Sequence, residues 1–139
     1  MEKLFPDETI ITTNHFEVGQ DWEIPIPGFF IISSKRKINS VADLNEEESK
    51  EFIKLLINLR RGMKEVLKIK DVYLFQNEDS EHKFHLWIFP RHGWMERFGR
   101  KIESVRPIMN YAKENMKNDK IIEEVKISVN KIREYMKSF

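Results

Sequence analysis

The pattern of hydrophobic positions changes period along the chain, from the short apolar runs of strands to the spacing of a helix. Residues 9–19 and 28–37 are rich in apolar, β-branched and aromatic side chains, and prolines and a glycine interrupt the segment between them. Such runs, bounded by turn residues, predict β-strands. Over residues 43–70 the apolar side chains instead recur every three or four positions, which predicts an amphipathic helix. The stripe consists of Phe52, Leu55, Leu56, Leu59, Met63, Val66 and Leu67.

A capping sequence marks the start of this helix. Asn45 can accept hydrogen bonds from free backbone N–H groups of the first turn, and Glu48 stands at the capping-box position three residues later. The acidic first turn also complements the positive end of the helix dipole. We therefore predict that Asn45 is the N-cap.

The second half of the chain adds two more β-like runs and two helices. Residues 71–77 and 82–89 suit neighbouring antiparallel strands, and residues 105–117 and 119–137 have helical spacing. This order of elements, without strict β-α-β alternation, predicts an α+β fold with an antiparallel sheet. Period-two alternation in the strand over 82–89 separates two faces. Phe84, Leu86 and Ile88 are expected beneath the long helix, with Lys83, His85, Trp87 and Phe89 on the opposite face.

Composition narrows the functional classes. The chain has 139 residues, 40% hydrophobic and 34% charged, and the net charge of +1 provides no bulk attraction to nucleic acid or an acidic membrane. It has no cysteine, which excludes disulfides and thiol chemistry, and its carboxylates and histidines do not cluster at metal-ligand spacing. No signal-peptide core or membrane-spanning window is present in the sequence, so we expect a cytoplasmic protein.

The candidate chemistry lies in "HKFHLWIFPR", residues 82–91. His82 and His85 point apart on a regular strand, which argues against a two-histidine metal clamp. From the residues alone, His85 is either a catalytic side chain or an ordinary polar residue on a sheet face.

This stretch resembles the signature strand of the histidine-triad (HIT) superfamily. In that family three histidines alternate along a strand that often runs on into Pro-Arg. Alignment on the Pro-Arg pair places Lys83, His85 and Trp87 at the three positions, so the middle histidine, the family's nucleophile, is retained and the other two are replaced.

Upstream landmarks extend the resemblance over residues 14–92. They are a strand, Asp21 before a proline-containing turn, a Pro-Gly pair, an apolar strand ending in basic residues, and "SVADL" before the acidic helix start. The resemblance implies a single HIT-like domain over residues 1–139, with a sheet of about five strands and residues 105–137 as a helical extension.

The resemblance also implies a site. The position of Asp21 binds ribose hydroxyls in the family, that of Trp22 lines the base pocket, and that of Asn77 contacts phosphate. Lys83 can supply positive charge, and Trp87 can donate one hydrogen bond or stack on a base.

Residue by residue, plainer interpretations stay open. Asp21 can cap the turn beside its prolines, Trp22 can belong to the core, and Asn77 can be a turn residue. His82 and His92 are either loop residues or stand-ins for the missing histidines. Arg91 is expected to be structural, and the basic segment 97–106 to be a solvated face.

The implied function is hydrolysis or transfer of a nucleotide through a nucleotidyl-His85 intermediate, on a dinucleoside polyphosphate or a similar adenylate derivative. A divalent cation can travel with such a substrate, and the family typically forms homodimers. Two alternatives remain: a nucleotide-binding module that has lost its chemistry, and a dimeric interaction protein that keeps only the fold. An orientation of His85 into a cleft shared with Asp21 and Asn77 disfavours the interaction protein, whereas burial under Trp87 or Trp94 disfavours the enzyme.

Overall fold

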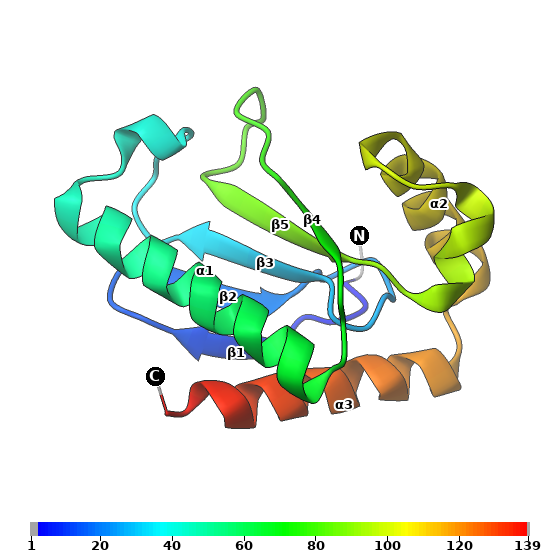
Figure 1. Cartoon of the computed structure of the whole chain (residues 1–139). Coiled ribbons are helices and arrows are strands. Elements are labelled where there is room, and N and C mark those ends of the chain that lie inside the picture. Colours follow the sequence, from blue (N-terminus) through cyan, green and yellow to red (C-terminus); the bar gives the residue numbers. More distant parts are fainter. Residues whose placement is uncertain (1–2, 139) are drawn as a thin grey trace.

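The computed structural model describes residues 3–138, whose sheet is five-stranded and antiparallel with strand order β1-β2-β3-β5-β4 (Figure 1). The predicted α+β class with an antiparallel sheet is confirmed. The apolar run over 9–19 forms a hairpin, because the backbone turns at residues 13–15 and the Thr13 N–H bonds to the Phe16 carbonyl at 2.8 Å. The strands are β1 (Thr9–Thr12), β2 (Phe16–Gln20), β3 (Phe30–Ser34), β4 (Val72–Phe75) and β5 (His85–Pro90).

Helix α1 (Glu46–Val66) begins where the capping sequence predicted. The Asn45 side chain accepts from the Glu48 backbone N–H at 2.8 Å, and the Glu48 carboxylate accepts from the Asn45 N–H at 2.9 Å. Glu48 is itself buried and pairs with Arg36 at 2.8 Å, which links the helix start to the segment after β3. The N-cap prediction is confirmed.

The main core lies between one face of the sheet and helices α1 and α3 (Asp119–Met136). Phe84 meets Phe52 of α1 with ring centroids 5.5 Å apart, and Leu86 and Ile88 belong to the same core, as the alternation predicted. Burial of this apolar stripe is the principal drive for docking both helices. From α3 the core takes Val125, Val129, Ile132 and Met136.

A second, smaller core covers one end of the opposite face. Helix α2 (Val105–Asn115) and the 3₁₀ segments Gly93–Phe98 and Ile102–Ser104 pack there, beside β4 and β5 (Figure 1). Its buried members are Ile24, Ile26, Phe29, Phe89, Met95, Val105, Ile108 and Ala112.

The loop between β2 and β3 makes a tight turn on the border of this second core. The Phe29 N–H bonds to the Ile26 carbonyl, with Pro27 and Gly28 between them. Gly28 has φ +85°, which is typical of the third position of a type II turn and favours glycine. This loop carries Asp21 and Trp22 to the edge of the open part of the sheet face. Within residues 3–138, none of the helices combines the length and the apolar character that crossing a membrane requires.

Candidate functional site

The sheet face opposite α1 presents the candidate residues in rows across the strands. His85 on β5 is the register partner of Ser33 on β3, and the next row joins Ile31, Trp87 and Phe75 of β4. Since alternate residues of a strand share a face, His85 and Trp87 lie on the same surface.

His85 is held in one tautomer by the backbone. Its Nδ1 is hydrogen bonded to the carbonyl oxygen of Lys83, and because a carbonyl only accepts, Nδ1 carries the proton. Burial lowers the pKa of His85 below its ordinary value of 6.5, and the nearby charges of His82 and Lys83 act in the same direction. The ring is therefore neutral at neutral pH, and Nε2 keeps a lone pair that no described residue occupies with a hydrogen bond.

Aromatic rings surround the half-buried His85 ring. The centroids of Trp22, Trp87 and His82 lie 6.5, 5.8 and 5.9 Å from it. His85 lines a small hollow of about 130 Å³ together with Ser33, Trp22 and neighbouring residues of β2 and β3. Trp94 lies elsewhere, against Phe98 and Tyr111.

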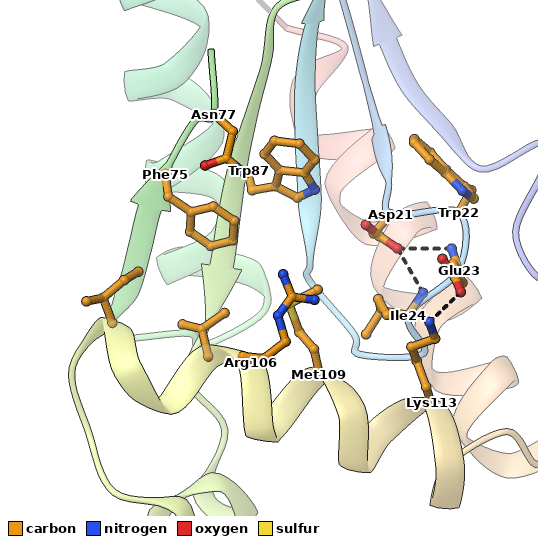
Figure 2. Close-up of a pocket in the computed structure, with 12 residues that line it drawn as sticks. Asp21, Trp22, Glu23, Ile24, Phe75, Asn77, Trp87, Arg106, Met109 and Lys113 are labelled. Carbon is orange, nitrogen blue, oxygen red and sulfur yellow. Dashed lines mark hydrogen bonds and ion pairs between the residues drawn. The ribbon is translucent and has the colours of Figure 1, made fainter. Parts of the chain in front are cut away.

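A larger cavity of about 410 Å³ adjoins this hollow on the side of α2 (Figure 2). Asp21, Trp22, Asn77 and Trp87 line it, so the structure brings together four of the candidate residues. His85 lines the adjacent hollow instead, and Trp22 is a wall of both. The Lys83 side chain lines neither, although its carbonyl orients His85.

Asp21 is buried and structurally engaged. One carboxylate oxygen accepts from the backbone N–H groups of Glu23 and Ile24, at 2.9 and 2.8 Å, so the turn-capping interpretation describes this oxygen correctly. The Trp87 indole nitrogen is directed toward the carboxyl group (Figure 2), and this donor favours the charged form of Asp21. Burial raises the pKa of Asp21, and these hydrogen bonds oppose that shift by stabilising the anion. The ribose role of Asp21 stays a prediction.

Trp87 is fixed on two sides. Its ring is stacked with Phe75 at a centroid distance of 5.7 Å and an interplanar angle of 11°, while its N–H is directed at Asp21. An indole N–H is a donor only and does not transfer its proton at neutral pH, so this residue can orient a ligand but cannot protonate a leaving group.

Of the two histidines outside the strand, one is placed beside His85. His82 is exposed and in edge contact with it. His92 instead donates from Nε2 to the Pro27 carbonyl at 2.6 Å, burial lowers its pKa, and it lines a different hollow with Trp94 and Glu124. His82 is thus the histidine whose position allows it to act with His85.

The residues of α2 that line the larger cavity were missed by the sequence analysis. Arg106, Met109 and Lys113 project from this helix toward the cavity (Figure 2). Ile102 and Val105 continue the wall. The basic residues of segment 97–106 are exposed, as expected, and one of them, Arg106, also lines the cavity. The signal was the stripe of positions 102, 106, 109 and 113, whose spacing is that of one helix face.

Arg91, expected to be structural, secures this region. Its guanidinium donates to the Gly99 carbonyl at 3.0 Å and to the Ser104 hydroxyl at 3.3 Å. These bonds attach the segment that precedes α2 to the end of β5. Over residues 3–138, no three carboxylate or imidazole side chains are grouped so that they could hold a metal ion.

Comparison with known proteins gives a fold assignment through structure alone. No protein-family model matches the chain, and no curated protein matches it by sequence. Among solved structures, a histidine-triad nucleotide-binding protein from Sulfolobus tokodaii superposes with a TM-score of 0.65 at 14% identity, over 99% of this chain and 86% of that one. The chain has the histidine-triad fold.

Two further histidine-triad structures agree. A Hit-like protein from Bartonella henselae has a TM-score of 0.60 at 16% identity and covers 97% of this chain and 88% of its own. Diadenosine triphosphate hydrolase from Plasmodium falciparum has a TM-score of 0.57 at 19% identity, over 84% of this chain and 80% of that one. At these identities the likeness extends to the backbone fold, and chemistry must be argued from the site residues.

Proposed function

We propose that this histidine-triad-like protein cleaves a nucleotide phosphoanhydride or a related adenylate through a covalent nucleotidyl-His85 intermediate. The observation that carries the proposal is the orientation of His85. Its Nδ1 proton is bonded to the Lys83 carbonyl, its pKa is lowered by burial, and Nε2 is left without a partner among the described residues. A neutral imidazole with one free nitrogen is what attack on phosphorus requires.

In this mechanism Nε2 of His85 bonds to the α-phosphorus, and the bond from phosphorus to the leaving group breaks with its electron pair on the leaving group. Water then attacks the same phosphorus and loses a proton to solvent, the P–N bond breaks with its electron pair returning to Nε2, and a nucleoside monophosphate is released. Lys83 contributes positive charge near the phosphoryl oxygens, and Asn77 a side-chain amide donor. Asp21 and Trp22 hold the nucleoside beside the cavity that they line.

The replaced third histidine limits which leaving groups can depart. Trp87 cannot donate a proton, and a general acid contributes about 10²–10⁴-fold in rate. A pyrophosphate-type leaving group needs less protonation than an amine does. We therefore expect phosphoanhydrides to react faster than phosphoramidates, unless His82 supplies the proton.

A second candidate function is binding without turnover. It is favoured by the separation of His85 from the cavity that Asp21 and Asn77 share, and by the engagement of Trp87 with Phe75 and Asp21.

Under either function we expect a homodimer, because β4 is an edge strand and Leu74 on it is 48% exposed.

The deciding experiment is release of AMP from diadenosine tetraphosphate and from adenosine phosphoramidate. We expect turnover by the wild type to be abolished in His85→Ala and retained in His15→Ala, which removes a histidine outside both hollows. A denatured wild-type sample quenched during turnover should carry one adenylyl group. Absence of turnover above that of His85→Ala on both substrates would establish the binding module as the better description.

A further inference from the structure

The larger cavity contains a cationic side chain without a counterion. Arg106 extends from the first turn of α2 into the space between Trp87 and Ile24 (Figure 2). It makes no hydrogen bond or ion pair with any residue of the described part of the chain. A guanidinium placed in this way is a ready partner for an oxyanion, to which it can bond through two parallel N–H groups.

The other charged groups around the cavity are already satisfied. Lys113 pairs with Glu23 at 2.7 Å, so these two cancel. Asp21 accepts from two backbone N–H groups and faces the Trp87 indole N–H. Among the four charged side chains of this lining, Arg106 is thus the one without a hydrogen-bond or ion-pair partner in the described part of the chain, which leaves it available to a negative group of a ligand.

The position of Arg106 relative to His85 indicates which part of a bound nucleotide would carry the negative group. Trp87 lies two residues along β5 from His85, an advance of about 6–7 Å. Arg106 lies beyond Trp87, on the side of α2, and shares the cavity with Asp21 and Trp22 while His85 lines the neighbouring hollow. A phosphate at His85 and an anion at Arg106 are thus separated by the place assigned to the nucleoside.

We propose that the substrate is a nucleotide with a second phosphate on its ribose, at the 2′ or the 3′ position, and that Arg106 binds this phosphate while the 5′-phosphate lies at His85. The inference rests on the proposed nucleotide site and adds the substrate class. Arg106 is exposed, so its guanidinium is accessible to a ligand, and Phe75 and Met109 are apolar members of the same cavity wall.

The test is calorimetric titration of the full chain with AMP, ADP, adenosine 2′,5′-bisphosphate and adenosine 3′,5′-bisphosphate. We expect one of the two ribose-phosphorylated nucleotides to bind at least about tenfold more tightly than AMP and ADP, because a charge-assisted bidentate contact is worth more than about 1.4 kcal/mol, or one factor of ten. Which isomer binds tightly identifies the ribose position.

Arg106→Gln should remove this preference and leave the affinity for AMP unchanged, which also shows that the variant is folded. Lys117→Gln, which removes an exposed charge just after α2, should keep the preference. Equal affinity for AMP and both bisphosphates would overturn the inference, as would a preference that survives in Arg106→Gln or is matched by ADP.

The two proposals fail separately. If the bisphosphate preference depends on Arg106 but no substrate is turned over, the substrate class stands and the hydrolytic function falls. If AMP release depends on His85 but no preference exists, the hydrolytic function stands and the role of Arg106 falls. If no nucleotide binds, the inference about Arg106 is wrong.

Discussion

The protonation state and the orientation of the His85 ring follow from three local features. The Lys83 carbonyl fixes the Nδ1 proton, burial disfavours the imidazolium, and the neighbouring positive charges disfavour it further. The hydrogen bond to the Lys83 carbonyl raises the pKa of His85, because it also stabilises the charged ring. Desolvation lowers the pKa by more, so the net shift is downward. One side chain is thereby kept neutral and correctly oriented by its own strand.

These contacts predict the acid limb of the pH–rate profile. Attack requires neutral His85, so activity is lost as the pH falls through the pKa of this group in the free protein. Since that pKa is lowered from 6.5, we expect the midpoint of the acid decline in kcat/KM to lie below pH 6.5. The measurement is initial AMP release between pH 4.5 and 8. A midpoint at or above pH 6.5 would contradict a lowered pKa.

At the scale of elements, local sequence decided most of α1. Its apolar stripe and its capping residues lie within about one or two turns of one another, so no long-range contact is needed to predict them. The ion-pair partner of the buried Glu48 could not be predicted from the local sequence, because Arg36 is 12 residues away and is brought to Glu48 by the tertiary structure.

This partner makes the helix start sensitive to acid. Arg36 and the Asn45 N–H lower the pKa of Glu48 from 4.5 to about 2. A carboxyl group with a lowered pKa stabilises the fold above its unfolded pKa and loses that contribution as the pH falls toward its folded pKa. We expect Glu48→Gln to lower the free energy of unfolding by about 1–3 kcal/mol at pH 7, with the deficit shrinking between about pH 4.5 and 2.

Denaturant unfolding at several pH values measures this deficit. Glu46→Gln is the matched control, because its carboxylate is 83% exposed and its pairing with Lys50 is that of a surface i,i+4 pair, expected to change stability by less than about 0.5 kcal/mol. A Glu48→Gln deficit that stays constant down to pH 2 would exclude the linkage.

At the scale of the whole molecule, the close approach of α1 and α3 holds the two helices on one sheet face. Gly62 lies inside α1, about one turn before its end, and a Cβ built there would be 2.6 Å from Cδ1 of Tyr135 on α3. Glycine is costly inside a helix, so its presence at this position reflects the packing of the neighbouring helix.

Gly62→Ala therefore sets two effects against each other. Alanine gains about 1 kcal/mol of helix propensity, but the Tyr135 ring must be displaced, which costs about 1–3 kcal/mol in a packed interface. We expect net destabilisation in thermal or denaturant unfolding. In a Tyr135→Ala background the same substitution should become stabilising, and a gain in both backgrounds would show that the helices do not meet closely at this point.

Some residues of the candidate site could be predicted from the local sequence, whereas others are brought to the site only by long-range contacts. His85, Trp87 and the turn after β2 were found because a strand period and a family-like order of landmarks can be traced along the chain. Arg106 was missed, since it lies 19 residues after Trp87 and nothing in its own neighbourhood shows that α2 folds back against that residue. The same holds for Lys113, whose ion pair with Glu23 spans most of the chain.

The sequence by itself thus determined the α+β class, the start of α1, the two faces of β5 and the neighbouring strands, because periodicity and capping are properties of adjacent residues. Tertiary structure alone decided that His85 and the Asp21–Asn77 cavity occupy adjoining hollows, that Asp21 is engaged by Trp87, and that α2 supplies an unpaired guanidinium. Each of these depends on which surfaces meet when the cores close, and burial of apolar area, which drives that closure, is a property of the whole chain rather than of any segment.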